Sequence, residues 1–323
     1  MGDKTRNIVN VLVYGSAIVD FICYVDRLPK AGETLHGYKF ANGFGGKGAN
    51  QCVAAARLGA NTAMIAKLGT DMWGEQYVQQ LKSENVNVDF VKQCAGESTG
   101  IAQIAVSSEG ENHIVIVAGA NNNLAANDVH EAEELFQNAK VLLCQLETPL
   151  DGTLAALQAF KGISILNAAP ALKNTPAELL KAATILCVNE TEAALMCELE
   201  DIKTLCQAKT AAKKLLELGA QTVIITLGSQ GAVYTSTKEP SKCIHVPAYK
   251  VEKVLDTTGA GDAFLGALAF HMAQNPQQEL HQHIGFANYV AAHSVKYPGT
   301  QTSFPKAQDI QTVVRQTYNF SEI

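Results

Sequence analysis

The residues with the clearest chemical potential form one short run, Asp256-Thr257-Thr258-Gly259-Ala260-Gly261-Asp262, which precedes an apolar stretch from Ala263 to Phe270. Glycines before an apolar stretch predict a tight turn that opens a buried helix, whose first backbone N–H groups have no partners within the helix. These amides and the positive end of the helix dipole favour an anion at the turn. Asp262 lies among them, either as a helix cap or as a base held beside a phosphate.

A second glycine-rich motif, Gly43-x-Gly45-x-x-Gly48, lies near the N-terminus. Its spacing matches the dinucleotide fingerprint, but that fingerprint follows the first strand of a βαβ unit and is followed by an acid about 20 residues further on. Here the motif comes after an irregular stretch, and no acid lies at that spacing. A dinucleotide-dependent dehydrogenase is therefore disfavoured. A Walker A loop is excluded because Lys47 is followed by Gly48 instead of Ser or Thr.

The elements that must position these motifs alternate between strand and helix. A short apolar strand ends at Gly15-Ser16, and a small-residue helix follows the second motif. From residue 128 onward the alternation is regular, with helices at 128–138, 150–161, 176–182, 190–197 and 203–218 and strands at 141–146, 163–166, 184–188 and 222–227. This pattern predicts an α/β fold, with a central, mostly parallel sheet and helices on both faces.

Two stretches interrupt the alternation and show the short-period pattern of antiparallel strands, one from about residue 21 to 42 and one from 99 to 118. Two separate excursions that pair with each other are typical of a lid over a site in the parent domain. We therefore expect a single domain over residues 1–323, with a small β-sheet lid inserted at about 20–42 and 97–118.

Polar side chains follow four of the predicted parallel strands, namely Glu147, Asn167, Asn189 and Thr226. In open α/β sheets, ligands bind at the carboxyl ends of the strands, so these side chains are candidates for a binding site.

The composition limits the classes of function. Hydrophobic residues make up 47% of the 323 residues and charged residues 17%, as in a soluble globular protein, and the net charge of −6 disfavours a nucleic-acid-binding surface. The single apolar segment near the N-terminus, residues 8–14, is too short for a signal sequence or a membrane span. We expect a protein of the cytoplasm, with the nucleus as a second location. The eight cysteines form no CxxC pair, which favours free thiols over zinc ligands or disulfides.

The run from Asn42 to Gln51 resembles the N-terminal signature of the ribokinase family of sugar kinases, and the run from Asp256 to Phe264 resembles its C-terminal signature. Further landmarks match in family order: Gln145-Leu146-Glu147, Asn189-Glu190-Thr191-Glu192, Thr226-Leu227-Gly228 and Gly299-Thr300-Gln301-Thr302-Ser303-Phe304-Pro305. The resemblance implies transfer of the γ-phosphoryl group of MgATP to the 5-hydroxyl of D-ribose. It also implies a homodimer formed through the β-sheet lid, with no nucleic-acid or membrane partner.

The resemblance assigns roles to the residues of both signatures. Gly259, Ala260 and Gly261 would form an anion hole for the γ-phosphate, and Asp262 would accept the proton of the sugar hydroxyl. The ribose contacts would be Asp20, Gly46, Lys47, Asn50, Glu147 and Asp262. A solvated Lys47 at a helix start is the alternative for that residue. Bacterial members often carry Asn at the position of Ile18, so one hydroxyl contact is missing here or is supplied from elsewhere.

The nucleotide and its metal ions would use the later landmarks. The ATP contacts would be Asn189, Thr226, Gly228, Gly231, Gly261 and Asn288, of which Asn288 is equally well explained as a structural residue. Glu192 would organise Mg²⁺ through water, or would only cap the helix that follows. An activating K⁺ would bind oxygens of Asp256, Thr258, Ser294, Tyr297, Gly299 and Ser303.

Two alternatives remain. The chain could phosphorylate another sugar or a nucleoside, or it could be a non-catalytic sugar or nucleotide sensor. A sensor would be expected to lose Asp262 or the glycines beside it, and the sequence retains all of them.

Overall fold

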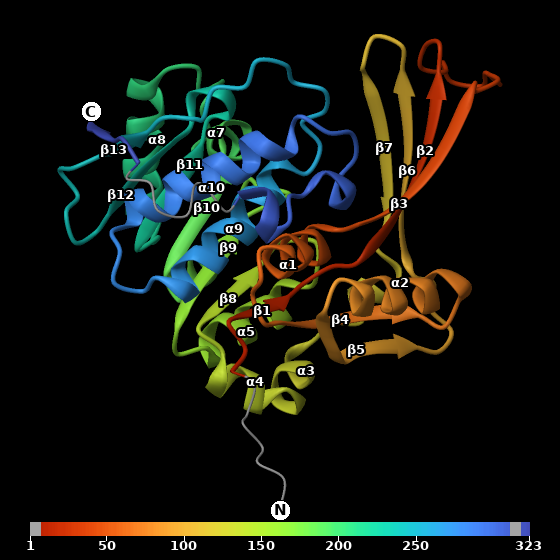
Figure 1. Cartoon of the computed structure of the whole chain (residues 1–323), viewed down its shortest axis with the longest axis horizontal. Coiled ribbons are helices and arrows are strands. Elements are labelled where there is room, and N and C mark those ends of the chain that lie inside the picture. The colour runs from red at the N-terminus through yellow and green to blue at the C-terminus, as the bar shows by residue number, and fades with distance from the viewer. Residues whose placement is uncertain (1–7, 311–317) are drawn as a thin grey trace, which may run out of the picture.

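A central sheet of ten strands spans the part of the chain that the computed structural model describes, residues 8–310 and 318–323 (Figure 1). Seven strands run parallel to one another and three follow antiparallel at one edge. Their spatial order is β14 (Ser321–Glu322), β13 (Ile244–Val246), β12 (Ala232–Ser236), β11 (Thr222–Thr226), β10 (Ile185–Asn189), β9 (Ile163–Asn167), β8 (Val141–Cys144), β1 (Val11–Tyr14), β4 (Thr62–Gly69) and β5 (Val86–Cys94). The predicted α/β fold with a mostly parallel sheet is confirmed.

Helices cover both faces of this sheet because alternate residues of each strand point to opposite sides. In β1, Val11 and Val13 pack into one core, whereas Leu12 and Tyr14 pack into the other. The first core is covered by α1 (Lys47–Arg57), α2 (Met72–Ser83), α9 (Ala260–Gln274) and α10 (Leu280–Ser294). The second is covered by α3 (Ala126–Glu131), α4 (Glu133–Asn138), α5 (Leu150–Ala159), α6 (Ala177–Ala182), α7 (Glu190–Met196) and α8 (Leu205–Glu217).

Helices α1 and α9 pack unusually closely. A Cβ atom on Gly266 of α9 would lie 2.5 Å from the Cβ of Ala54 and 2.6 Å from the carbonyl oxygen of Gln51, both in α1. Only glycine permits this approach. Because Asp262 lies one turn before Gly266, the same packing brings the start of α9 against the start of α1.

A second sheet of four strands projects from the body, at the upper right of Figure 1. Its order is β3 (Lys39–Gly45), β2 (Ile18–Val25), β6 (Gly100–Ser107) and β7 (Asn112–Val117). Strand β2 is antiparallel to β3 and parallel to β6, so the two predicted excursions do pair with each other. We call this sheet the lid. Its outer strand β7 is exposed along its whole length.

The root of the lid is fixed to the body by Asn121 in η1 (Gly119–Asn123). The Asn121 side chain accepts a hydrogen bond from the Ala17 N–H and donates one to the Ala17 carbonyl, both at 2.9 Å. It also donates to Ala118 at 2.8 Å. One buried amide therefore joins the chain entering β2 to the chain leaving β7.

Some elements differ from expectation. The helix expected at 128–138 is divided into α3 and α4. Strand β5 was not predicted, because this edge strand carries polar residues such as Asn87 and Asp89 and so resembles a loop. The short antiparallel strands after β11 were also missed. Three further single-turn helices are η2 (Gly228–Gln230), η3 (Gln301–Ser303) and η4 (Ala307–Ile310). No helix in residues 8–310 and 318–323 combines the length and the apolarity needed to cross a membrane.

Candidate active site

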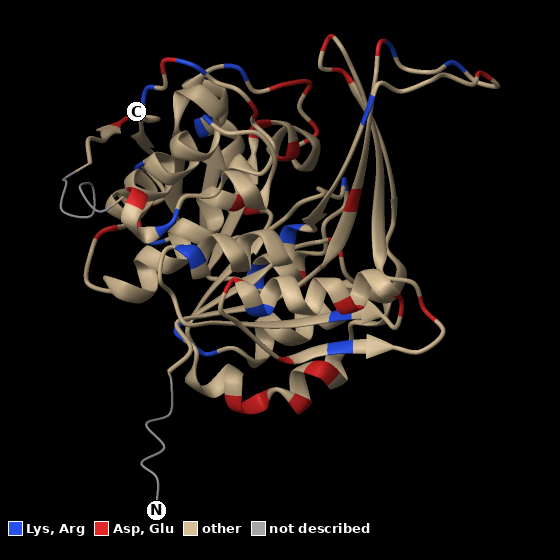
Figure 2. Cartoon of the chain, turned by 45° about the vertical axis from the view of Figure 1, so that its right-hand side comes forward, with Lys and Arg blue, Asp and Glu red and all other residues tan. Residues whose placement is uncertain are grey.

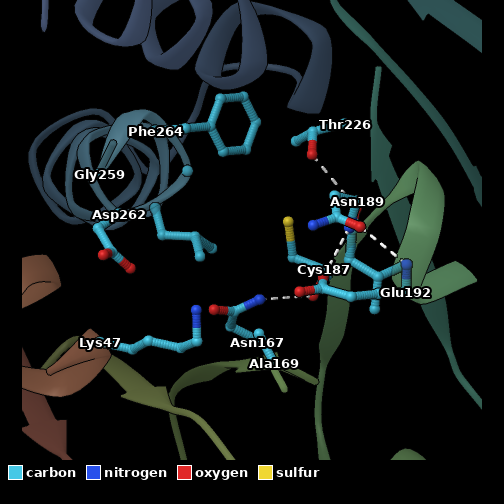
Figure 3. A pocket seen from close by; sticks show the side chains of 13 residues that line it. Lys47, Asn167, Ala169, Cys187, Asn189, Glu192, Thr226, Gly259, Asp262 and Phe264 are labelled. Carbon is cyan, nitrogen blue, oxygen red and sulfur yellow. Dashed lines mark hydrogen bonds between the residues drawn. The ribbon is translucent and has the colours of Figure 1, made fainter. Parts of the chain in front are cut away.

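A cavity lies where the carboxyl ends of β9, β10 and β11 face the start of α9 (Figure 3). It brings together eight of the residues singled out in the sequence: Lys47, Asn167, Asn189, Glu192, Thr226, Gly259, Gly261 and Asp262. These come from α1, β9, β10, α7, β11 and α9, so the site depends on the packing of six elements.

The turn before α9 has the predicted form. Gly259 has a φ of 76°, in the left-handed region, and precedes the first helical residue, Ala260. A Cβ atom on Gly259 would lie 2.6 Å from the Cγ2 atom of Thr300. Glycine is therefore required both by the left-handed backbone conformation and by the lack of space for a side chain. No side-chain hydrogen bond caps α9. The predicted anion hole is only partly available, because the Ala260 N–H donates to the Thr257 carbonyl at 3.1 Å. Among the described residues, the N–H groups of Gly261 and Asp262 have no backbone partner and remain available to an anion.

The carboxylate of Asp262 is not a helix cap. Its Oδ2 atom accepts a hydrogen bond of 2.9 Å from Asn50 Nδ2, and its Oδ1 atom accepts one of 3.0 Å from Gln51 Nε2. Burial raises the pKa of Asp262 above its ordinary value and Glu147 adds to the rise, whereas Lys47, Gln51 and Asn50 oppose it. The carboxylate lines the cavity and is held at both oxygens by side chains of α1.

Lys47 and Glu147 meet at the start of α1. Glu147 Oε2 accepts hydrogen bonds from the Lys47 backbone N–H at 2.8 Å and from the Ser16 hydroxyl at 2.6 Å. Burial alone would lower the pKa of the Lys47 ammonium, but the nearby Asp262, Glu147 and Glu192 carboxylates raise it. Lys47 is therefore positively charged at neutral pH, and it lines the cavity.

The other predicted sugar contacts lie at the junction of the body and the lid. Burial, Glu147 and Asp262 together raise the pKa of Asp20, in β2, to about 7. Gly46 immediately precedes α1 with a φ of 84°. Ile18 is only 3% exposed at the start of β2 and is absent from the described residues that line the cavity.

Two of the predicted nucleotide residues, Asn189 and Thr226, are register partners at the ends of β10 and β11. Asn189 and Glu192 form a capping box, in which each side chain accepts a hydrogen bond of 2.8 Å from the backbone of the other. Gly228 and Gly231 bound the turn that follows β11. Asn288 is buried in α10, and its amide donates to the carbonyls of Val246 and Pro247 at 3.1 Å.

The residues predicted to bind a monovalent cation lie in two adjacent loops. Asp256 Oδ1 accepts from the Thr258 N–H at 2.9 Å, and Asp256 Oδ2 accepts from the Gly299 N–H at 2.8 Å. The loops are also joined by the Leu255 N–H, which donates to the Val295 carbonyl at 2.8 Å. The hydroxyls of Ser294 and Ser303 donate to the carbonyls of Ala291 and Thr300, and Tyr297 is 48% exposed.

Several residues of the site received no role from the sequence. Ala169, Cys187 and Phe264 line the cavity. The polar cluster after β9 did point to Asn167, but nothing in the sequence showed which residues of β10 and α9 face inward. Gln51 was quoted only as part of a signature, although it contacts Asp262 directly.

Comparison with known proteins identifies relatives over almost the whole chain. A model described as pfkB family carbohydrate kinase matches residues 9–307. A ribokinase from Mus musculus is 44% identical and is aligned over 93% of each chain. A deoxyribokinase from Salmonella typhi is 35% identical over 93% of this chain and 97% of its own. The structure of Arabidopsis thaliana ribokinase complexed with ribose and ATP has a TM-score of 0.86 at 31% identity, covering 96% of this chain and 99% of that one.

Proposed function

The chain belongs to the pfkB family of carbohydrate kinases, and from this premise we propose that it transfers the γ-phosphoryl group of ATP to the 5-hydroxyl of D-ribose. The products are D-ribose 5-phosphate and ADP. One observation carries the proposal: a carboxylate, Asp262, and an uncapped helix start, Gly259 to Gly261, line the same cavity. The relatives named ribokinase supply the identity of the sugar.

The mechanism follows from positioning and charge, which are the main demands of phosphoryl transfer. The amides of the α9 turn bind the oxygens of the γ-phosphate. Asp262 accepts the proton of the sugar hydroxyl as the oxygen bonds to phosphorus. Asp20 and Glu147 orient the sugar from the lid root and from the loop after β8. Lys47 offsets part of the negative charge that gathers between sugar and nucleotide.

A divalent cation fits the charge of the site. Glu147, Glu192 and Asp262 lie near one ammonium, Lys47. A fourth carboxyl group, Asp20, lies near Glu147 and Asp262. This excess of carboxylates would repel the phosphates of free ATP. Glu192 uses one carboxylate oxygen in the capping box and keeps the other for a metal-bound water. Mg²⁺ would be held mainly by phosphates and water, and it supplies charge neutralisation. Residues 8–310 and 318–323 hold no group of three or more Asp, Glu, His or Cys side chains that could by itself hold a metal ion.

A monovalent cation, K⁺, fits the two loops joined by Asp256. The loops that carry Asp256 and Gly299 offer carboxylate and carbonyl oxygens, and they are joined by the hydrogen bond from the Gly299 N–H to Asp256. Thr258, Ser294, Tyr297 and Ser303 complete the predicted set. Thr300 in the second loop lies against Gly259. A cation there would order the loop on which the α9 turn rests.

We also propose that the chain acts as a homodimer formed through the lid. Four consecutive apolar residues of β7, Ile114 to Val117, are at least 51% exposed. Strand β7 pairs with β6 on one side and is the edge strand of the lid, with no neighbouring strand on its other side among the described residues. Such an edge is usually protected in a soluble protein. In this proposal residues 1–323 form one domain, and the lid both covers the sugar and provides the interface.

The cytoplasm, with the nucleus as a second compartment, is the proposed location, because the substrates are soluble metabolites. No nucleic-acid or membrane partner is proposed. Figure 2 supports this for nucleic acid, since Lys and Arg are interspersed with Asp and Glu over the chain.

The experiment that tests the proposed function is a coupled assay of ADP formation with a panel of acceptors, each with and without K⁺. D-Ribose should give the highest kcat/KM, and K⁺ should raise the rate. Activity with 2-deoxy-D-ribose tests whether Ile18, in place of Asn, removes a contact to one sugar hydroxyl. Activity with hexoses and nucleosides tests the alternative that the chain phosphorylates another sugar or a nucleoside. Preference for a nucleoside would overturn the sugar assignment, and absence of turnover with every acceptor would favour a sensor.

A further inference from the structure

The strongest feature outside the proposed roles is a set of buried side-chain amides behind Asp262. Gln51 is fully buried in α1, and Gln145 and Asn167 are 1% and 7% exposed at the ends of β8 and β9. Buried amides are costly unless they are hydrogen-bonded. Three of them in contact beside one carboxylate therefore require an explanation.

The amides form an ordered chain. Gln145 Nε2 donates to Gln51 Oε1 at 2.7 Å, and Gln51 Nε2 donates both to Asn167 Oδ1 at 3.1 Å and to Asp262 Oδ1 at 3.0 Å. Asn167 Nδ2 in turn donates to the Cys187 backbone carbonyl at 3.2 Å. The backbone carbonyl can only accept, so the orientation of each amide follows from that of the next. Gln51 consequently presents N–H groups, and not its oxygen, to Asp262.

A second arm holds the other carboxylate oxygen. Gln301 Nε2, in η3, donates to Asn50 Oδ1 at 3.1 Å, which leaves Asn50 Nδ2 to donate to Asp262 Oδ2 at 2.9 Å. The Tyr77 hydroxyl donates to the Gly45 carbonyl and can accept from Gln301 at 3.4 Å. Both oxygens of Asp262 thus accept hydrogen bonds from neutral amide groups. The orientation of each amide group is in turn fixed by its own hydrogen bonds to more deeply buried side chains.

We propose that Gln51 is a positioning residue for phosphoryl transfer: anchored by Gln145 and Asn167, it fixes the plane of the Asp262 carboxylate and leaves the remaining acceptor positions for the sugar hydroxyl. The inference rests on the proposed role of Asp262 as the base. A neutral donor suits this role, because it stabilises the ionised carboxylate without adding a proton that could be transferred to it.

The charged groups around Asp262 are Lys47 from α1, Glu147 from the loop after β8, Asp20 from β2 and Glu192 from α7. None of them contacts Gln51 through a hydrogen bond among the described residues. Replacing Gln51 therefore leaves these charges in place.

The test compares the pH dependence of kcat/KM for D-ribose in the wild type and in Gln51→Met, which keeps length and removes the donors. Loss of a hydrogen bond to a charged group should move the ionisation of Asp262 upward by about one pH unit. The plateau kcat should fall about tenfold, with the KM for MgATP within about twofold of wild type. Gln145→Met, which keeps the donor to Asp262 but frees its orientation, should produce a smaller shift.

Gln51→Glu provides the second variant if Gln51→Met does not fold. It keeps the shape and the acceptor for Gln145, but it places a second carboxyl group against Asp262, so one proton is shared and the ionisation should move further up than in Gln51→Met. An unchanged acid limb in a folded Gln51 variant would overturn the proposal and leave a purely structural role. Asp262→Asn separates the two claims, because full activity in that variant would contradict the base assignment itself.

Discussion

The layer formed by α1 and α9 and the lid differ in how they are held. The α1–α9 layer is buried, and its two helices pack so closely at Gly266 that no side chain fits between them. Asn50 and Gln51 of α1 fix Asp262 of α9 through hydrogen bonds to both carboxylate oxygens. The lid is a single thin sheet whose outer strand is exposed and which is joined to the body at its root by Asn121. The α1–α9 layer therefore holds the Asp262 carboxylate in place, whereas the proposed roles of the lid are to cover the sugar and to form the dimer interface.

The largest expected effect is at Asp262. Asp262→Asn keeps both the size of the side chain and part of its hydrogen bonding, but it cannot accept a proton. We expect kcat to fall by roughly 10²–10⁴-fold, the usual contribution of a general base. Steady-state assays with saturating D-ribose and MgATP measure this. Retention of more than about a hundredth of the wild-type kcat would contradict the assignment.

Replacing one glycine by alanine in the α1–α9 layer and one in the lid compares the packing of these two regions directly. Gly266→Ala forces α1 and α9 apart, and we expect it to lower the free energy of unfolding by about 1–3 kcal/mol. Gly43→Ala in β3 meets no atom within 4 Å and should change it by less than about 0.5 kcal/mol. Urea denaturation gives both values. Equal effects would show that the α1–α9 contact is no tighter than the lid.

A histidine pair makes the stability of the α9–α10 contact depend on pH. His271 and His283 are 2% and 3% exposed, with their Nδ1 atoms 2.8 Å apart. The pKa of His271 is lowered by burial and by His283 to about 4, and burial is the main cause of the lowered pKa of His283. Because His283 Nε2 must donate to the Gln278 carbonyl, His271 donates from Nδ1, and both rings are neutral.

The pair contributes stability that is present above pH 6.5, the unfolded value, and is lost as the pH falls toward 4. We expect the free energy of unfolding to drop by about 2 kcal/mol between pH 7.5 and pH 5 through His271. His271→Leu should flatten this dependence. His113→Gln, in the exposed strand β7, is the matched control. A wild-type pH dependence in His271→Leu would rule out the pair as its source.

The smallest expected effect on stability is at the edge of the lid. Val115→Glu together with Val117→Glu places charges on exposed positions and should change the free energy of unfolding by less than about 0.5 kcal/mol. If the proposed dimer forms through the lid, light scattering should nevertheless show a dimer for the wild type and a monomer for this variant. A wild-type protein that is already monomeric at micromolar concentration would contradict the proposal that the lid is a dimer interface.

The two regions also differed in how well the sequence predicted them. The regular alternation of apolar strand and helix segments predicted the parallel sheet. The alternation of residue types within 99–118 predicted the lid hairpin. Both are local patterns, so they can be recognised in the sequence. The turn at Gly259 and the capping box of Asn189 and Glu192 follow from residue types at short spacing. Strand β5 was missed because its polar positions resemble a loop.

Contacts across the chain were not predictable in the same way. Gln51 is separated by 211 residues from Asp262, and Gln145 by 94 residues from Gln51. No spacing rule joins such positions, since their meeting depends on the α1–α9 packing and on the order of the strands. The interpretation of Asp262 as a helix cap is likewise excluded only by contacts across the chain, because its carboxylate oxygens accept hydrogen bonds from α1.

The central claim is the position to which the phosphoryl group is transferred, and the identity of the product tests it most directly. Wild-type protein would be incubated with MgATP and D-ribose, and the phosphomonoester would be examined by ³¹P NMR with correlation to the sugar protons. We predict one ester, coupled to the two protons of C5, formed in equal amount with ADP. A phosphate on another carbon, or ADP released with inorganic phosphate alone, would contradict the account.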